Sequence, residues 1–267
     1  MADVRRTPAD VDPTIPLGAR VYDYILGGKD NFAVDREAAE KLLAVAPDSR
    51  ELAQAQRAFL VRVVRFLAES GIRQFLDLGT GIPTSPNVHE VARAVDPSAR
   101  VAYVDYDAMV IAHNRALLET TDGVIAIEGD LRQPEEIING PALRALVDFG
   151  KPVGVLLFGV LFNVSEEQDP FGIVARFREE MAPGSYIGIC HFATDSDREA
   201  MAQLEAIYAG TPWPLTLRSR DQVLRFFDGF ELVPPGLVDV QQWRPDTDTA
   251  STAPTALRMP GGVGRKL

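Results

Sequence analysis

The sequence is most informative at first through what it lacks: it has one cysteine and three histidines among 267 residues. A single cysteine, Cys190, excludes an intramolecular disulfide and any zinc site that needs two thiolates from one chain. No run of about 18 apolar residues occurs, so we expect no transmembrane helix. Such low cysteine usage is typical of a reducing compartment, and we therefore expect a cytoplasmic protein.

Basic residues are also scarce, because 27 lysines and arginines stand against 38 aspartates and glutamates, for a formal net charge of -11. This acidic balance argues against a protein that grips phosphate backbones, so we expect no nucleic-acid partner. The histidines and carboxylates show no metal-ligand spacing, and we expect no metal. The hydrophobic fraction of 46% is ordinary for a globular chain with a sizeable core.

The first quarter of the chain is polar and then helical. Residues 1–16 lack an apolar segment and are expected to form a disordered leader. Residues 17–70 are expected to form a helical lid or cap, followed by a ligand-binding domain at 71–267. Helix patterns cover Ala19–Ile25, Arg36–Val45 with Asp35 as its cap, and Arg50–Ser70.

From residue 74 onward, short apolar runs alternate with helical patterns. The runs are Gln74–Leu78, Val101–Val104, Val124–Ile127, Val153–Phe158 and Ser185–Cys190, with two later ones at Phe230–Val233 and Gly262–Arg265. The helical patterns are Asn87–Val95, Asp107–Glu119, Glu135–Val147, Asp169–Met181, Asp197–Ala209 and Ser219–Phe227. Nearly all-apolar strands separated by helices predict a doubly wound α/β fold whose parallel sheet is covered on both faces.

Glycines and acidic residues gather where the first three strands end. Asp77-Leu-Gly-Thr-Gly81 closes the first strand, Asp105 the second, and Asp130 the third. In such folds ligands bind outside the carboxyl ends of the strands. Glycines let the backbone approach a ligand, and an acidic residue after the second strand can accept hydrogen bonds from ribose hydroxyls. The third glycine of a dinucleotide fingerprint is missing, which disfavours a pyrophosphate ligand.

These motifs resemble those of class I S-adenosylmethionine-dependent methyltransferases. More narrowly, the chain resembles an actinobacterial family of S-adenosyl methyltransferases that was long described as a domain of unknown function. The resemblance extends from Ala19 to Lys266 and rests on Ala19–Phe32, Gln74–Thr84, Asn87–Glu90, Asp221–Phe227 and Gly261–Arg265.

The resemblance implies a Rossmann-like sheet of seven mostly parallel strands that ends in an antiparallel hairpin. It also implies a cofactor, S-adenosylmethionine, with glycines at its methionine portion, Asp105 at its ribose and the third strand end around its adenine. The cofactor-binding residues expected in this part of the chain are Asp77, Gly79, Thr80, Gly81, Asp105, Tyr106, Asp130 and Leu131.

A cluster of charged, amide and aromatic residues surrounds Gly27-Gly28. One interpretation is a lid that folds over the strand ends, with Tyr22 in the substrate pocket. The lid residues expected at the cofactor are Arg20, Tyr24, Gly28, Asp30 and Asn31. The alternative is a helical hairpin that packs on the sheet, with Tyr22 in the core and Asp30-Asn31 as a turn.

The residues that would bind the acceptor or carry catalysis have no distinctive motif. Phe158 ends the fourth strand, Phe162 and Asn163 follow it, and all three either line the acceptor pocket or belong to the core. His191 follows the fifth strand and is the candidate general base, with a structural histidine as the alternative. Adjacent Cys190 is not its partner, because successive strand side chains point to opposite faces. No Asn/Asp-Pro-Pro-Tyr signature is present, which disfavours methylation of a nucleic-acid base or an amide.

The sequence therefore predicts a methyltransferase that transfers a methyl group in line to a small-molecule acceptor. Two alternatives remain at this point: a non-catalytic S-adenosylmethionine-binding or regulatory protein, and an NAD-dependent oxidoreductase. Neither the accepting atom nor the oligomeric state can be read from the residues.

Overall fold

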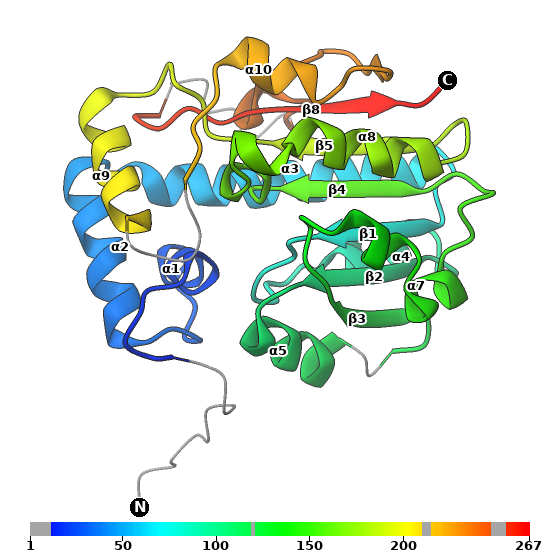
Figure 1. The fold of residues 1–267 in the computed structure, drawn as a ribbon, viewed down its shortest axis with the longest axis horizontal. Coiled ribbons are helices and arrows are strands. Elements are labelled where there is room, and N and C mark those ends of the chain that lie inside the picture. The colour runs from blue at the N-terminus through cyan, green and yellow to red at the C-terminus, as the bar shows by residue number, and fades with distance from the viewer. Residues whose placement is uncertain (1–11, 119–120, 210–214, 247–254) are drawn as a thin grey trace, which may run out of the picture.

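One mixed sheet forms the centre of the structure, a computed structural model that describes residues 12–118, 121–209, 215–246 and 255–267 (Figure 1). Within these residues the sheet has eight strands in the order β3-β2-β1-β4-β5-β8-β6, and β7 also pairs with β8. The first five strands run parallel, whereas β8 is antiparallel to its neighbours. The strands are β1 (Gln74–Leu78), β2 (Arg100–Asp105), β3 (Val124–Glu128), β4 (Gly154–Phe158), β5 (Tyr186–Cys190), β6 (Glu231–Leu232), β7 (Val238–Asp239) and β8 (Pro260–Arg265). The predicted doubly wound sheet is confirmed, and β7 is an addition to the seven expected strands.

Helices cover both faces of the sheet, because alternate side chains of each apolar strand point to opposite sides. Phe75 joins the buried cluster that contains α3 and α4, while Leu76 and Leu78 of the same strand join the cluster beneath α6, α7 and α8. The helices on the two faces include α3 (Ser49–Glu69), α4 (Val88–Val95), α5 (Ala108–Leu118), α6 (Pro134–Ile138), α7 (Pro141–Leu146), α8 (Pro170–Glu180) and α10 (Arg220–Arg225).

The segment from 135 to 147 differs from its prediction as one helix. It forms two short helices, and the break lies at Gly140-Pro141. Proline has no N–H for the helical ladder and its ring clashes with the preceding turn, so α6 ends and α7 begins with Pro141 at its first position.

The N-terminal helices α1 (Gly18–Ile25) and α2 (Ala33–Val45) lie with α9 (Arg198–Tyr208) beyond the carboxyl ends of the parallel strands, where the arrowhead of β4 points in Figure 1. Asp35 joins α1 to α2, because its carboxylate accepts hydrogen bonds from Leu17 N at 2.9 Å and Phe32 N at 2.8 Å. It caps α2 from inside the first turn, so this helix begins earlier than the predicted Arg36. In contrast, α3 packs against β4 and β5.

The end of the expected disordered leader is ordered where it is described. Arg20 donates to the carbonyl oxygens of Asp12 and Ile15 and so holds residues 12–16 against α1. Residues 1–11 of the leader, and 247–254 of the loop between the two late strands, lie outside the described residues.

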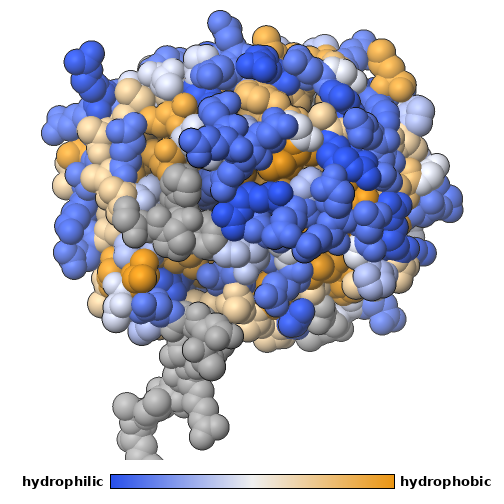
Figure 2. Space-filling view, in the orientation of Figure 1, coloured by the Kyte–Doolittle hydropathy of each residue, from blue (hydrophilic) through white to orange (hydrophobic). Residues whose placement is uncertain are grey.

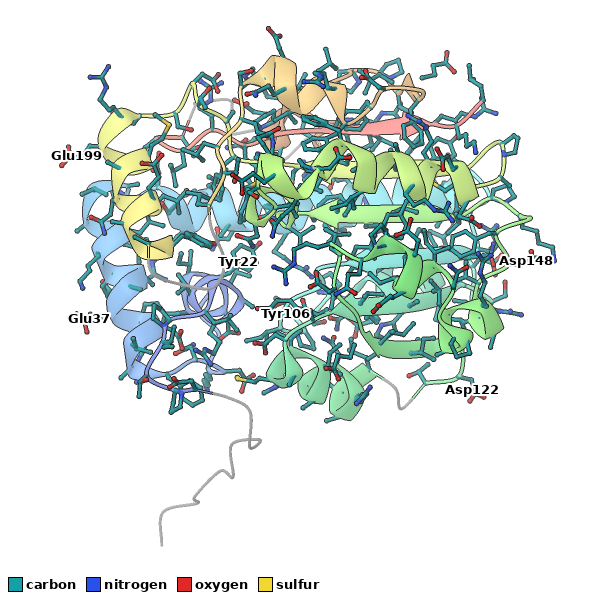
Figure 3. The ribbon with its side chains drawn as sticks, viewed as in Figure 1. Tyr22, Glu37, Tyr106, Asp122, Asp148 and Glu199 are labelled. Carbon is teal, nitrogen blue, oxygen red and sulfur yellow. The ribbon has the colours of Figure 1, made fainter. Side chains whose placement is uncertain are left out.

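Most of the excess acidic charge lies on the surface. Figure 3 shows Glu37, Asp122, Asp148 and Glu199 at the rim of the molecule, and all four are exposed. On the face drawn in Figure 2, hydrophilic side chains spread over most of the surface and hydrophobic ones lie between them in small groups. No helix in the described part of the chain has the length and hydropathy needed to cross a membrane. The cytoplasmic location stays a prediction.

Candidate functional site

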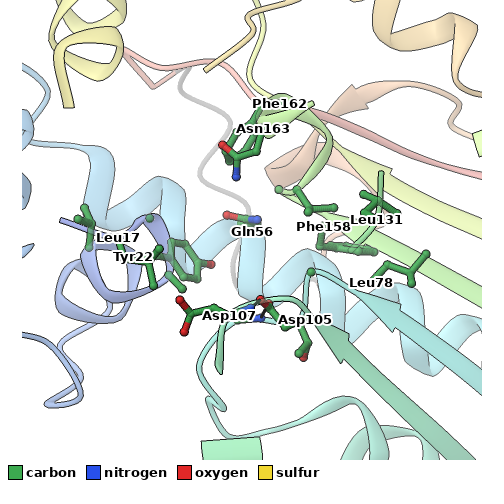
Figure 4. Close-up of a pocket in the computed structure, with 18 of the residues that line it drawn as sticks. Leu17, Tyr22, Gln56, Leu78, Asp105, Asp107, Leu131, Phe158, Phe162 and Asn163 are labelled. Carbon is green, nitrogen blue, oxygen red and sulfur yellow. Dashed lines mark hydrogen bonds between the residues drawn. The ribbon is translucent and has the colours of Figure 1, made fainter. Parts of the chain in front are cut away.

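A pocket opens at the carboxyl ends of β1 to β4, between the sheet and α1 (Figure 4). The wall formed by the ends of β1, β2 and β3 is termed the polar half and comprises Asp77, Leu78, Gly79, Thr80, Gly81, Asp105, Tyr106, Asp107, Gly129, Asp130, Leu131 and Arg132. The opposite wall comes from α1, α3, α9 and the segments after β4 and β5. It is termed the aromatic half, and its main residues are Tyr22, Ser49, Leu52, Gln56, Arg57, Leu60, Phe158, Phe162, Asn163, Phe192, Leu204 and Tyr208.

The turn after β1 exposes backbone atoms to the pocket, because two of its residues are glycines. Gly79 and Gly81 have φ angles of +70° and +67°, a conformation that glycine adopts without strain. A Cβ atom at Gly79 would lie 2.4 Å from the side chain of Val160, whereas one at Gly81 would meet nothing within 4 Å. Arg57 of α3 donates to the carbonyl oxygens of Thr84 and Pro86 and thereby anchors the end of this loop.

Two buried carboxylates flank the glycine turn. Asp105 accepts from Gly81 N at 2.9 Å and from Asp107 N at 3.1 Å, and Asp77 accepts from the hydroxyl of Thr80 at 3.1 Å. Burial raises the pKa of both carboxyl groups to about 6. A ligand that brings positive charge or hydroxyl donors would stabilise their ionised forms.

The third strand end carries a paired carboxylate. Arg132 binds Asp130 through two parallel contacts, Nε to Oδ1 at 2.8 Å and Nη2 to Oδ2 at 2.6 Å. These bonds hold the pKa of Asp130 below its usual range. Asp107 accepts from Met109 N and Val110 N and so caps α5, which leaves Asp105 to the pocket wall.

The aromatic half presents neutral polar groups among rings. Figure 4 shows the side chains of Tyr22, Gln56 and Asn163 directed toward one space beside Phe158. The hydroxyl of Tyr22 donates to Ala53 O at 3.2 Å, and Gln56 Nε2 lies 3.6 Å from the sulfur of Cys190. The Oδ1 atom of Asn163 is buried and has no hydrogen-bond partner among the described residues.

His191 lies outside the pocket, so the structure does not support the predicted general-base role. Its ring is fully buried on the other face of the sheet, where it stacks on Phe226. Nδ1 lies 2.6 Å from Phe192 O and Nε2 lies 2.9 Å from Nη1 of Arg218, so both ring nitrogens are engaged. Burial lowers the pKa of His191 to about 4, which leaves a neutral ring at pH 7. The alternative, a structural histidine, agrees with this position, and Cys190 on the opposite face is not its partner.

The position of the His191 ring is set by Arg218. Its guanidinium is fully buried and also donates to Leu161 O at 3.0 Å, to Val164 O at 2.8 Å and to the carboxylate of Glu166 at 2.9 Å. These bonds hold the 3-10 turn η1 (Leu161–Asn163), which carries two residues of the aromatic half. The Arg218–His191 pair therefore stabilises the part of the pocket wall that η1 forms.

The lid residues expected at the cofactor do not line the pocket; they are Arg20, Tyr24, Gly28, Asp30 and Asn31. Asn31 Nδ2 donates to the carboxylate of Asp23 at 2.8 Å and to Gly28 O at 3.2 Å. Asp23 also accepts from Asp30 N at 2.9 Å, and a Cβ atom at Gly28 would collide with its carboxylate. The segment after α1 is thus a turn built around Asp23, as the helical-hairpin alternative predicts.

The two remaining lid residues are engaged inside the N-terminal segment as well. Arg20 Nε lies 2.9 Å from Oδ2 of Asp35, and both side chains are almost fully buried. The hydroxyl of Tyr24 donates to Glu40 at 2.5 Å. Tyr22 is the residue of the group that lines the pocket, so the structure gives no support to the predicted cofactor contact of the others.

Sequence reasoning missed several pocket residues, chiefly Gln56, Arg57, Asp107, Arg132 and Tyr208. One of them carried a readable signal: Gln56 lies four residues after Leu52 within the buried stripe of α3, where a polar residue is unexpected. Tyr208 carries no such signal, because only the packing of α9 beside α2 brings it to the site.

The strand order, the glycine turn after β1 and the acidic ends of β2 and β3 define the class of this protein: a Rossmann-like, S-adenosylmethionine-dependent methyltransferase. The chain belongs to the family described as S-adenosyl methyltransferase, whose model matches residues 4–267. This membership favours methyl transfer over the NAD-dependent oxidoreductase that the fold would also allow, and S-adenosylmethionine is the cofactor.

Two solved structures are similar over nearly the whole chain. A DUF574 family protein from Streptomyces avermitilis MA-4680 has 38% sequence identity and a TM-score of 0.92, and the match covers 96% of this chain and 99% of that one. A protein from Thermobifida fusca YX has 41% identity and a TM-score of 0.90, with 97% and 98% covered. No curated protein matches the chain.

Proposed function

We propose that S-adenosylmethionine binds in the polar half of the pocket and that a small-molecule acceptor binds in the aromatic half, where it receives the methyl group by in-line displacement. One observation carries this proposal: buried carboxylates meet two positive-φ glycines on one wall, while aromatic, apolar and neutral polar side chains make up most of the facing wall, with Arg57 as its charged residue in the described part of the chain.

The residues of the polar half fit the cofactor in kind. Gly81 has open space where a side chain would be, so its backbone can lie against the methionine portion together with Gly79 and Thr80. The carboxylate of Asp105 accepts backbone N–H groups of Gly81, Asp107 and Tyr106, and a carboxylate has about four lone-pair sites, which leaves one for a ribose hydroxyl. Tyr106, Asp130 and Leu131 line the part of the polar half proposed for the adenine.

The bound cofactor supplies a methyl group that is already activated on a positively charged sulfur. The protein then has to orient the acceptor, exclude water and match the positive charge. Asp77 and Asp105 supply negative charge on one side, and rings of the aromatic half offer faces that attract a cation. Of the proposed helical cap at 17–70, α1, Leu42 of α2 and the first half of α3 line the pocket.

Titration calorimetry with S-adenosylmethionine tests the cofactor site. Asp105→Asn replaces one acceptor oxygen by an N–H₂ group, and we expect it to weaken binding by at least about tenfold, the cost of a lost charge-assisted bond. Asp122→Asn, a change at an exposed carboxylate, is the matched control and should bind as wild type does. Gly81→Ala, which places a methyl group into the pocket, should also weaken binding. Unchanged affinity in both pocket variants contradicts the proposed site.

Turnover separates an enzyme from a protein that only binds the cofactor. Methyl-labelled S-adenosylmethionine is incubated with fractionated small-molecule extract, and release of S-adenosylhomocysteine is followed. We expect one fraction to drive label into a low-mass product. Tight binding without turnover in any fraction would support the non-catalytic alternative.

A further inference from the structure

Negative side chains outnumber positive ones in the described wall of the pocket. Four aspartates line the polar half, whereas the arginines of the whole described wall are Arg57 and Arg132. Arg132 is paired with Asp130. Arg57 has no carboxylate partner in the described part of the chain. It is therefore the positive charge of the pocket that an anionic group of a ligand can pair with.

One nitrogen of Arg57 fixes its guanidinium in place. Nη2 donates to the carbonyl oxygen of Thr84 and, at 2.9 Å, to that of Pro86, whereas Nε and Nη1 have no hydrogen-bond partner among the described residues. The guanidinium is planar and rigid, so the bonds of one nitrogen also fix the direction of the others. Arg57 is half-buried and lines the pocket. Its remaining N–H groups can therefore donate charge-assisted hydrogen bonds to a carboxylate.

Arg57 lies where the two halves of the pocket meet. The loop that it binds continues the glycine turn after β1, and the hydroxyl of Tyr22 donates to Ala53 O, one turn earlier on the same helix. Burial raises the pKa of Tyr22 and that of Asp77, and the positive charge of Arg57 opposes this rise in both. The guanidinium is thus within electrostatic reach of both walls, beside the turn proposed for the methionine portion of the cofactor.

We propose that Arg57 binds the carboxylate of the methionine portion of S-adenosylmethionine and thereby sets the direction in which the cofactor lies across the strand ends. This inference rests on the proposed function, which assigns the cofactor to the polar half. Elsewhere in that half the aspartates would repel the carboxylate, and an unpaired charge in a buried site is costly. With the carboxylate at Arg57, the ribose lies at Asp105 and the adenine at the end of β3.

Three ligands that share adenosine and a thioether sulfur test the contact by calorimetry. S-Adenosylhomocysteine carries a carboxylate and an ammonium group, S-adenosyl-3-thiopropylamine lacks the carboxylate, and 5′-(3-carboxypropylthio)-5′-deoxyadenosine lacks the ammonium. Arg57→Met keeps the apolar stem and removes the charge. We expect it to weaken the two carboxylate ligands by about 10- to 100-fold, the range for hydrogen bonds to a charged group. It should not weaken S-adenosyl-3-thiopropylamine, which has no group for the guanidinium to bind.

The comparison among ligands separates a lost contact from a loosened loop. If Arg57→Met acted only by releasing Thr84 and Pro86, it would weaken the three ligands equally. Arg65→Met changes an exposed arginine of the same helix and is the matched control, which should bind all three ligands as wild type does. Thermal unfolding of each variant, measured first, reports whether it is folded.

An acid group on the acceptor is the other possible source of a carboxylate, and benzoate is the probe for it. Benzoate is titrated into protein saturated with S-adenosylhomocysteine, where we expect no binding that depends on Arg57, because the cofactor already occupies the guanidinium. Benzoate that binds this complex in wild type and not in Arg57→Met would overturn the proposal and assign Arg57 to the acceptor.

The outcomes distinguish the two proposals. If S-adenosylhomocysteine does not bind wild-type protein, the proposed function fails. If it binds, but Arg57→Met leaves its affinity unchanged or weakens the three ligands equally, the carboxylate contact alone is overturned. Selective weakening of the two carboxylate ligands supports the contact.

Discussion

The buried guanidinium of Arg218 allows a quantitative test of how the pocket wall is supported. Arg218→Met keeps the length and the apolar stem but removes every donor. It leaves Leu161 O, Val164 O and His191 Nε2, which lie 2.8–3.0 Å from the guanidinium, without their partner. Each unpaired buried acceptor costs about 1–3 kcal/mol, and relief of the desolvated charge offsets part of the sum. We expect the free energy of unfolding to fall by about 3 kcal/mol, within the range for a broken buried pair.

Urea unfolding at pH 7 measures this change, with Arg225→Met as the control. Arg225 lies over the ring of Phe171 but is exposed, so its loss should cost no more than about 1 kcal/mol. The double variant Arg218→Met with His191→Phe should recover part of the loss, because one fewer acceptor is left unpaired. A loss below about 1 kcal/mol for Arg218→Met would refute the reasoning that these bonds hold the wall.

Four further predictions concern the glycine turn, its carboxylates and the N-terminal turn. Because burial raises the folded-state pKa of Asp77 to about 6, the folded protein binds more protons than the unfolded chain between about pH 4 and 6. The stability of the ligand-free protein therefore falls as pH rises through this window, and Asp77→Asn should become more stable relative to wild type. A stability difference in urea unfolding that does not change with pH would contradict this. S-Adenosylmethionine should bind with proton release near pH 6, since its positive charge favours ionised Asp105. Calorimetry in buffers of different ionisation enthalpy measures this release. A binding enthalpy that is the same in all buffers would contradict it. Gly79→Ala should lower the melting temperature and weaken cofactor binding, because its Cβ would meet Val160 at 2.4 Å; wild-type values for both would argue against the close approach. Asn31→Ala should lower stability with little change in cofactor affinity, and the opposite pattern would restore the lid contact.

Much of the fold could be predicted from the sequence, because its signals are local. The apolar runs that became β1, β2, β4 and β5 are buried on both faces, and a parallel sheet is the structure that buries such runs, with β3 half-buried at its edge. Gly79 and Gly81 marked the turn, since few other residues adopt their φ angles. The single helix expected at 135–147 was an avoidable error, because Pro141 is itself a local signal.

The candidate site was predictable only in its polar half. Strand ends of a parallel sheet must meet at one edge, so residues such as Asp77, Asp105 and Asp130 converge whatever the loops do. Polar residues elsewhere could not be assigned, because a side chain that can bind a ligand can equally bind the protein itself. The carboxamide of Asn31 donates a hydrogen bond to Asp23 within a turn, and the hydroxyl of Tyr24 donates one to Glu40.

The sequence by itself determined the order of strands and helices, the glycine turn and the acidic strand ends, because spacing along one chain is enough to specify them. Only the tertiary structure decided which polar groups remain available to a ligand. His191 follows β5 directly, yet the pleat turns it to the face where Arg218, distant in sequence, occupies its second nitrogen. Asn163 lies five residues after β4 and lines the pocket, because that same arginine binds the carbonyl oxygen of Leu161 in the turn that carries it.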